Sequence, residues 1–247
     1  MSEHGVPIRI HVAGELHAGR DRVLPERQAH HVSRVLRLAP GDALTLFNGD
    51  GAEYDAVVAR ATRDGVTVKV ASTRAGLPEP VLDITLAQAL SSGERMDYTV
   101  QKAVELGVAA VHPIEARRSV VRLDAARAEK RVQHWQSVVI SACEQCGRNR
   151  IPTVATVTSL DAWLAPRGAA ALRVLLSPRG EAQLRDLPRP EGPVLLLAGP
   201  EGGFTRDEEN HACDAGYAAV RLGPRVLRTE TAAVAALAAM QALWGDF

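Results

Sequence analysis

The chain has 247 residues with 29 basic and 29 acidic side chains, so its formal net charge is zero and nothing global draws it to nucleic acid or to a membrane. Its contents of 46% hydrophobic and 23% charged residues are those of a globular protein with a real core, in one large domain or two smaller ones. Three cysteines make no disulfide framework, and no apolar run reaches the length of about 18 residues that spans a membrane, so we expect a soluble cytoplasmic protein without a secretory leader.

Arginine dominates the basic residues, because lysine stands only at Lys69, Lys102 and Lys130. Arginine is the better side chain for bidentate phosphate contacts and for stacking on bases. A GC-rich genome would encode the same bias, so both explanations stay open at this point.

The N-terminal part of the chain is predicted to be mostly β. One helical segment interrupts it at residues 26–38, with an apolar side formed by Val32, Val35, Leu36 and Leu38. Short strands around one helix indicate a small barrel or barrel-like sheet. The predicted strands are residues 8–12, 43–47, 53–59 and 66–71.

Residues 74–81 are predicted to be a linker rich in glycine and proline, and the pattern changes after it. Apolar strands then alternate with helices, which indicates an α/β domain with a largely parallel sheet. The predicted strands are 82–87, 108–114, 172–176, 194–198 and 218–222, and the predicted helices are 95–106, 124–146, a short one from about 181, 206–215 and 230–243.

The last predicted helix is apolar nearly all round, so most of its faces should be buried. It would lie deep in the core of a monomer or pack against a second subunit. Because its alanines allow close approach, we favour the second subunit.

The segment LLLAGPEGGFTRDE, residues 195–208, runs from an apolar strand into a glycine-rich turn and then into a helix. Thr205 and Glu208 have the spacing of a capping box, which places the helix start. The turn matches neither common phosphate-binding fingerprint, which argues against a Walker-type NTPase and a standard dinucleotide fold. An acidic turn at the carboxyl end of a strand better suits a ligand with hydroxyls or positive charge.

A second turn of this kind follows the next predicted strand, in RLGPRVLRTETA at residues 221–232. In open α/β sheets ligands bind in crevices at the carboxyl ends of strands. Two such turns side by side are therefore expected to hold one flat ligand through their backbone groups.

The only C-x-x-C motif, Cys143 with Cys146, lacks the second ligand pair of a zinc site and does not begin a helix as redox motifs do. We interpret both as structural thiols. Glu144 and Arg148 have helical spacing, which fits either a surface ion pair or a polar helix end that faces a substrate.

Several segments together resemble the RsmE family in order and spacing: HHVSRVLRL (30–38) followed by GDALTLFNGDGAEY, KAVELGV (102–108), EQCGRNRIP (144–152), GPEGGFTRDE (199–208) and RLGPRVLRTETA (221–232). Members of the family use S-adenosylmethionine (SAM) to methylate N3 of a uridine in the decoding region of 16S ribosomal RNA. Over nearly the whole chain, the resemblance implies a PUA-like RNA-binding β-barrel at 1–74 and a SPOUT-type α/β domain with a C-terminal trefoil knot at 75–247. It also implies a homodimer with the active site near the subunit boundary, and no metal.

The resemblance places site residues on the two turns and on arginines elsewhere. Arg148 is expected to stabilise negative charge on a uracil oxygen, and Glu201 or Glu230 to orient the cofactor or accept the imide proton. An RNA track is expected at Arg9, Arg34, Arg37, Arg95, Arg117 and Arg118. The cofactor-binding residues are expected to be Ser177, Leu197, Gly199, Pro200, Glu201, Gly202, Gly203, Leu222, Gly223, Val226, Leu227 and Arg228.

One position departs from many relatives, in which a lysine precedes the glycine at 93; here Ser92 stands there, and Arg95 or a neighbour would have to compensate. Two other functions fit the sequence. One is a SPOUT methyltransferase that acts on another nucleotide or on a ribose 2′-hydroxyl, and the other is a non-catalytic RNA-binding factor in ribosome assembly.

Overall fold

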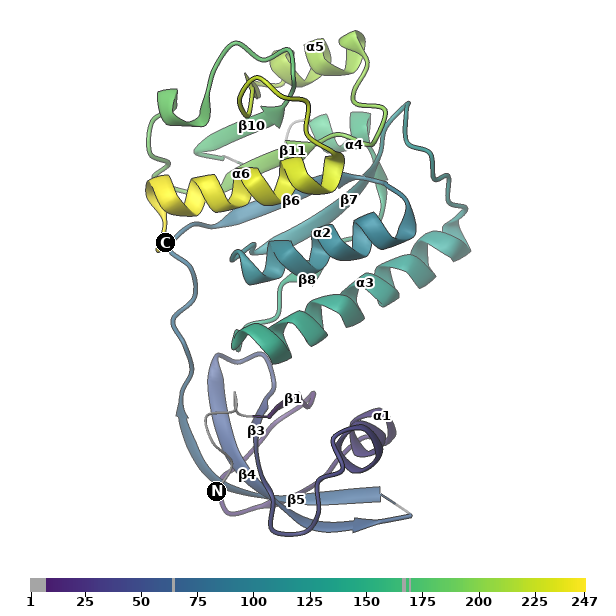
Figure 1. Cartoon of the computed structure of the whole chain (residues 1–247), viewed down its shortest axis with the longest axis vertical. Helices are drawn as coiled ribbons and strands as arrows, with labels where there is room; N and C mark the ends of the chain where they lie inside the picture. Colours follow the sequence, from purple (N-terminus) through teal and green to yellow (C-terminus); the bar gives the residue numbers. More distant parts are fainter. Residues whose placement is uncertain (1–7, 64, 166–167, 169) are drawn as a thin grey trace. The chain divides into compact units, whose positions relative to one another are not determined.

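The computed structural model describes residues 8–63, 65–165, 168 and 170–247. The chain divides into two compact units, Met1–Glu79 with Cys143–Ile151 and Pro80–Ala142 with Pro152–Phe247 (Figure 1). The sequence placed a boundary after residue 74 and did not anticipate that Cys143–Ile151 packs with the first unit, because no local pattern marks such an excursion. Residues 1–7 of the expected first domain lie outside the described part of the chain.

The first unit is built on one five-stranded sheet with the order β1-β3-β4-β5-β2. Strands β1 and β3 are parallel, and the other neighbours are antiparallel, with register shifts between β4 and β5 that bend this long pair. The strands are β1 (Arg9–His11), β2 (Asp21–Val23), β3 (Ala43–Phe47), β4 (Ala52–Thr62) and β5 (Gly65–Ala75).

The helical segment of this unit starts as α1 (Glu26–His30) and continues as a π-helix, η1 (His31–Val35). The amide of Leu36 donates to the carbonyl of His31, an i to i+5 bond that changes which residues share a face. Val32 is fully buried, but Val35 is 58% exposed. The prediction that Val35 belongs to the apolar side was therefore wrong, because it assumed an ordinary α-helix.

The second unit carries a parallel sheet with the order β12-β10-β11-β6-β7-β8, and β9 pairs with β7. Every described neighbour pair in it is parallel, which confirms the predicted α/β class. The strands are β6 (Ile84–Ala89), β7 (Ala110–Glu115), β8 (Thr153–Val154), β9 (Thr158–Ser159), β10 (Leu172–Leu176), β11 (Val194–Ala198) and β12 (Ala218–Val220). The short strands β8 and β9 were not predicted because two polar-flanked residues carry no periodicity.

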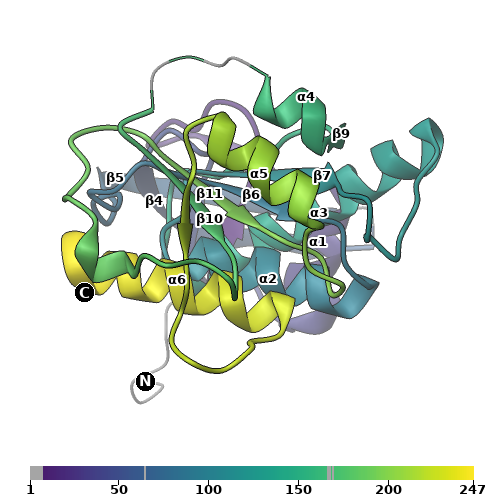
Figure 2. The ribbon, with the colours of Figure 1, turned by 90° about the horizontal axis from the view of Figure 1, so that it is seen from above.

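Helices cover both faces of this sheet (Figure 2). Helices α2 and α6 contact each other on one face, and α4 and α5 lie together on the other. The helices are α2 (Gly93–Glu105), α3 (Ala125–Cys146), α4 (Leu160–Leu164), a 3-10 turn η2 (Leu184–Asp186), α5 (Arg206–Asp214) and α6 (Thr229–Trp244). None of the described helices is long and apolar enough to cross a membrane.

The central strand β11 shows why its sequence is uniformly apolar. Leu196 and Leu197 point to opposite faces, and both are fully buried. Leu197 belongs to a cluster with Trp163 and Tyr217, whose ring nitrogen and hydroxyl are joined by a 2.8 Å hydrogen bond. The strand is thus held by packing on both sides, which fixes the position of the turn that follows it.

Candidate functional site

The site lies at the carboxyl edge of the parallel sheet. Strand β10 is paired with β11 on one side and with β12 on the other, so the turns that follow these three strands meet. Between them is a cleft of about 240 Å³. The lining residues are Arg118, Leu176, Ser177, Pro178, Arg179, Gly199, Pro200, Glu201, Gly202, Gly203, Phe204, Glu209, Val220, Arg221, Leu222, Arg225, Val226, Leu227, Thr229 and Ala232.

A hydrogen-bonded triangle joins the turn after β11 to the first turn of α6. The hydroxyl of Thr229 donates to the carbonyl of Gly199 at 2.6 Å, and the side-chain amide of Gln88 donates to the Thr229 hydroxyl at 3.0 Å and to the same carbonyl at 3.4 Å. Gln88 is fully buried and Thr229 is 7% exposed. Because buried polar groups are costly unless paired, this triangle fixes the two walls of the cleft against each other.

The turn at residues 199–203 forms the first wall of the cleft. Two of its glycines are required for different reasons, one for close packing and one for backbone conformation. A Cβ on Gly202 would lie 3.0 Å from the Cβ of Arg118, so the close approach of these two segments needs a bare backbone. Gly203 has φ +64°, a left-handed conformation that side chains other than asparagine rarely adopt. Helix α5 then begins at a capping box, in which the Thr205 side chain accepts from the Glu208 backbone amide and the Glu208 side chain accepts from the Thr205 backbone amide.

Two carboxylates share one arginine beside this wall. Arg95 lies 3.3 Å from Oε1 of Glu201 and 3.8 Å from Oε1 of Glu230, and the backbone amide of Ser92 donates to Glu201 at 2.9 Å. The Oε2 atoms of both glutamates are buried and have no hydrogen-bond partner among the described residues. Each carboxylate thus has one buried oxygen that no described residue satisfies.

The environment of Glu201 favours its charged form. Burial opposes ionisation, but hydrogen bonds from the backbone amides of Ser92 and of Glu201 itself, together with the Arg95 guanidinium, outweigh it and lower the pKa of Glu201. Glu201 is therefore an anion over the physiological pH range and a weak proton acceptor.

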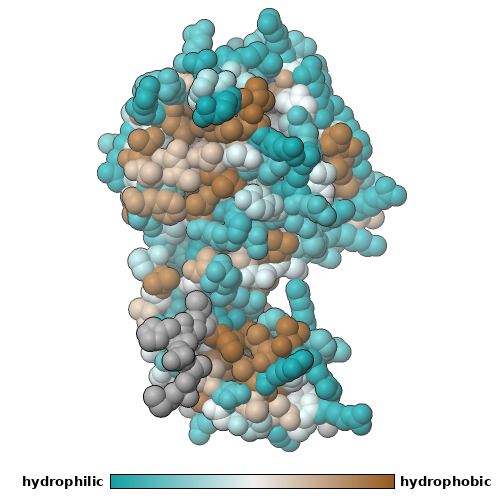
Figure 3. Space-filling view, viewed as in Figure 1, coloured by the Kyte–Doolittle hydropathy of each residue, from teal (hydrophilic) through white to brown (hydrophobic). Residues whose placement is uncertain are grey.

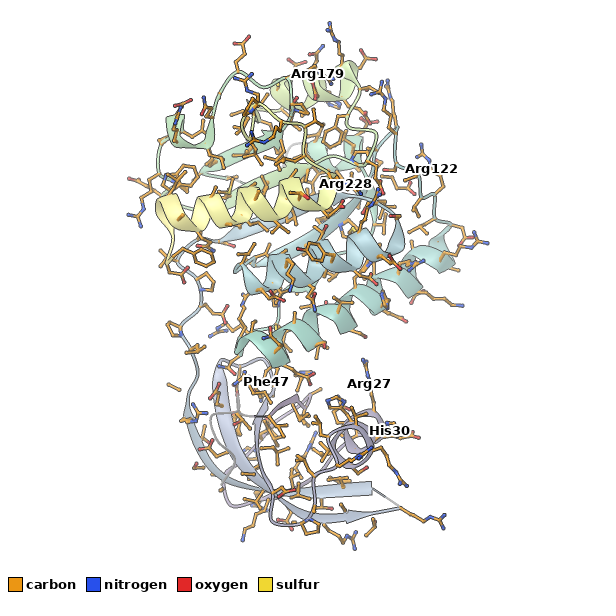
Figure 4. The ribbon with its side chains drawn as sticks, in the orientation of Figure 1. Arg27, His30, Phe47, Arg122, Arg179 and Arg228 are labelled. Carbon is orange, nitrogen blue, oxygen red and sulfur yellow. The ribbon has the colours of Figure 1, made fainter. Side chains whose placement is uncertain are left out.

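A second carboxylate network lines the opposite side of the cleft. Glu209, on α5, accepts from the Ser177 hydroxyl at 2.7 Å and from Arg179 at 2.9 Å. Arg179 also donates to the carbonyl of Phe204 at 3.2 Å, which ties the loop after β10 to the end of the glycine turn. Figure 4 labels Arg179 above α6, in the upper part of this unit.

Most of the predicted cofactor residues lie together at the cleft. Leu197 is instead fully buried in the core, while Gly223 and Arg228 belong to the second turn without lining the space. Sequence reasoning missed the side chains that brace the walls, above all Arg179, Glu209 and Thr229. Its place at the predicted start of α6 was the only signal for Thr229, because burial of a polar residue is set by tertiary structure.

Arg148 lies in the first unit, where its guanidinium pairs with Glu79 at 2.6 Å and is largely buried. Arg9, expected on an RNA track, is 7% exposed. Its guanidinium donates to Glu53, to the carbonyl of Arg148 and to the Asn149 side chain, and it lies over the ring of Phe47. We therefore interpret Arg9 as a structural clamp on the Cys143–Ile151 segment. Such a role depends on contacts across more than one hundred residues, which no local pattern reveals.

The other arginines of the expected RNA track are dispersed. Arg34 and Arg37 are exposed in the first unit, and Arg37 has φ 57°. Arg117 pairs with Asp207 at 3.2 Å, and Arg118 donates to the carbonyl of Gly202 at 3.2 Å. Arg95 faces the two carboxylates described above.

Cys143, the buried cysteine of the C-x-x-C motif, is a poor nucleophile in this structure. Burial raises the pKa of the Cys143 thiol to about 12, so it stays protonated at neutral pH. None of the three cysteines forms a disulfide, and the described residues contain no cluster of histidine, cysteine and carboxylate side chains that could hold a metal ion.

Comparison with known proteins agrees with this architecture. The family model for an RNA methyltransferase domain matches residues 78–241, and a model for the PUA domain of RNA methyltransferases matches residues 24–71. The fold and the cleft thus define an RNA methyltransferase of the α/β class with a PUA domain.

Individual relatives narrow this class. Ribosomal RNA small subunit methyltransferase E of Mycobacterium bovis is 36% identical over 91% of this chain and 87% of its own length. The enzyme of that name from Neisseria gonorrhoeae, solved bound to SAM, is 40% identical with a TM-score of 0.92, over 98% of this chain and 100% of the other. A Legionella pneumophila protein, described as a methyltransferase and solved with SAM, is 41% identical with a TM-score of 0.95 over the same shares. The chain belongs to the ribosomal RNA small subunit methyltransferase E family.

Proposed function

We propose that this protein transfers a methyl group from SAM to N3 of a uracil in the decoding region of 16S ribosomal RNA. The observation that carries the proposal is the cleft between residues 199–203 and 222–229, in a chain about 40% identical to two proteins solved with SAM. The family names support small-subunit ribosomal RNA as the substrate. The choice of N3 rests on the resemblance of the sequence motifs.

The residues of the cleft fit SAM. The ligand carries a sulfonium, an ammonium and ribose hydroxyls, and the cleft offers the carboxylates of Glu201 and Glu209 as counter-charges and acceptors. The glycine turn exposes backbone groups without a Cβ in the way. When bound, SAM supplies an electrophilic methyl group.

The reaction also needs the imide N3–H of uracil to lose its proton. Between the two glutamates, Glu230 is proposed as the acceptor, because hydrogen bonds and the Arg95 guanidinium lower the pKa of Glu201 and make it a weak proton acceptor. Glu201 would orient the cationic part of the cofactor. Arg148 would stabilise the charge that develops on a uracil oxygen, and for this its guanidinium would have to exchange Glu79 for the substrate.

The first unit is proposed to hold RNA, with Arg34 and Arg37 as exposed phosphate contacts. Arg9 is left out because its side chain is buried and paired. The target base must be unpaired or turned outward to reach a cleft in the second unit.

A homodimer is proposed through α6. Its buried face carries Leu237 and Met240, while its other side presents alanines and Leu243, which is 46% exposed. Figure 3 shows hydrophobic atoms along this helix on the face toward the viewer. Alanine allows close helix contact, so Leu243→Glu is expected to yield monomers in sedimentation equilibrium, and an unchanged dimer would count against this interface.

We also propose that the C-terminal segment forms the trefoil knot of SPOUT domains and that the protein works in the cytoplasm. The central placement of β10 between β11 and β12, with α6 returning to bond Gly199 at the first wall, supports a threaded chain. The knot would be contradicted by a crystal structure whose backbone becomes an unknotted line when its two ends are pulled apart.

The function is tested by mass mapping of small-subunit RNA after incubation with the enzyme and labelled SAM, on naked RNA and on assembled subunits. We expect one methyl group on uracil N3. A label on another base or on a ribose 2′-hydroxyl would establish the first alternative, and RNA binding without transfer would establish the second. Arg148→Ala should reduce transfer far more than SAM affinity, and equal losses in both would contradict its role.

A further inference from the structure

The turn between β12 and α6 presents arginines that the sequence-based RNA track did not include. Arg221 and Arg225 line the cleft and are exposed, as is Arg228 at the N-cap of α6 (labelled in Figure 4). Among the residues that the structure describes, none supplies a hydrogen bond or an ion pair to these guanidinium groups. The backbone around them is fixed all the same, since the Arg221 amide donates to the carbonyl of Ala182 and the Arg228 carbonyl accepts from Ala232.

The other arginines around the cleft are already engaged. Arg179 pairs with Glu209, and Arg118 is bonded to the carbonyl of Gly202. Their guanidinium groups are held within the protein, whereas those of Arg221 and Arg225 are available to a ligand. Charges of opposite sign are therefore separated across the site. Carboxylates lie at the turn of residues 199–203 and on α5, and unpaired guanidinium groups lie on the turn between β12 and α6.

This separation fits two ligands of opposite charge in one site. The sulfonium and ammonium of the cofactor are attracted to the carboxylates, while a polyanion is repelled by the carboxylates and held by the arginines. Guanidinium groups match phosphate oxygens in bidentate geometry. Val226, which follows Arg225 in the chain, is 79% exposed and adds an apolar surface beside the charged one.

We propose that Arg221 and Arg225 bind the phosphodiester backbone of the substrate RNA next to the target nucleotide, so that the turn which closes the cofactor cleft also positions the RNA. This inference rests on the proposed function. Arg221 and Arg225 are positioning residues in it, because they hold the strand and do not touch the reacting atoms.

The test compares Arg221→Ala with Arg225→Ala, singly and together, in the full-length protein. RNA affinity is measured by fluorescence anisotropy on a small-subunit RNA transcript across a range of salt concentrations, and SAM affinity is measured by calorimetry. Arg189→Ala is the matched control, because Arg189 is exposed and does not line the cleft. Arg225→Lys keeps the charge and tests whether charge alone suffices.

We expect the double variant to bind the transcript roughly tenfold more weakly, with the slope of log affinity against log salt reduced by about 0.7 for each arginine on single-stranded RNA. SAM affinity should stay within about twofold, and Arg225→Lys should retain the slope while losing part of the affinity. The KM for RNA should rise with kcat nearly unchanged.

An unchanged salt slope in the double variant would overturn the proposal, as would a loss of SAM affinity equal to the loss of RNA affinity, since the arginines would then serve the carboxylate of the cofactor. These results differ from a failure of the function itself. If the wild-type protein transferred no methyl group to small-subunit RNA, the proposed function would fall whatever the variants did.

Discussion

The hydroxyl of Thr229 donates a 2.6 Å hydrogen bond to the carbonyl of Gly199, and this bond joins the start of α6 to the turn after β11. Both residues line the cleft, so the bond sets its width as well as its stability. This bond could not be predicted from the local sequence, because its two partners are 30 residues apart.

Thr229→Val removes this bond while keeping the shape of the side chain. The Gly199 carbonyl keeps only the 3.4 Å contact with Gln88, and the amide of Gln88 loses an acceptor. We expect SAM affinity to fall by about 1–2 kcal/mol, roughly fivefold to thirtyfold in Kd, as measured by calorimetry. Thr231→Val, at an exposed position two residues along, should change nothing; equal effects of the two would show that the bond has no special role.

Gly203 allows the cost of a left-handed backbone to be tested without any contribution from steric crowding. No atom lies within 4 Å of the position that a Cβ would occupy there, so any cost of a side chain comes from φ +64°. Gly203→Ala should lower the free energy of unfolding by about 1–2 kcal/mol in urea titrations, and Gly203→Asn by clearly less, because asparagine tolerates the left-handed region. Equal losses for the two substitutions would contradict strain as the cause.

Glu201 should make stability depend on pH. Its folded-state pKa is below the ordinary value of 4.5, so its ionised form stabilises the fold above that value, and this contribution is lost as pH falls through the folded-state pKa. The free energy of unfolding should therefore drop more steeply between about pH 5 and 3 in the wild type than in Glu201→Gln. Glu94→Gln, which removes an exposed carboxylate, should follow the wild type; parallel curves for all three would rule out the coupling.

Arg95 was expected to contact RNA, but its contacts are with Glu201 and Glu230. If it positions these carboxylates, Arg95→Ala should lower kcat for methyl transfer severalfold with little change in RNA affinity. Arg95→Lys should restore part of kcat, because a cation remains between the two glutamates. A raised KM for RNA at unchanged kcat would instead support the expected RNA contact.

Those parts of the fold that follow from local pattern could be predicted from the sequence. Strand β11 was predicted with its observed bounds, because a strand covered on both faces must be apolar throughout. The capping box at Thr205 likewise gave the start of α5. Arg9 shows the limit, since Glu53 and Asn149 bury it from positions 44 and 140 residues away.

The candidate site was predictable as two turns but not as a set of side chains. Strand order brings residues 199–203 and 222–229 together, and glycine content pointed to both turns. Leu197 was expected among the cofactor-binding residues, and its side chain packs into a core cluster. Glu209 was missed because its position one turn into α5 is that of an ordinary charged helix start.

A crystal structure of the protein soaked with SAM tests the central claim most directly. We predict that the adenosine and methionine parts lie between Gly199–Gly203 on one side and Leu222–Leu227 on the other, with a carboxylate of Glu201 or Glu209 within hydrogen-bond distance. Density for the ligand at any other place, or a gap between the turns closed by side chains, would contradict it.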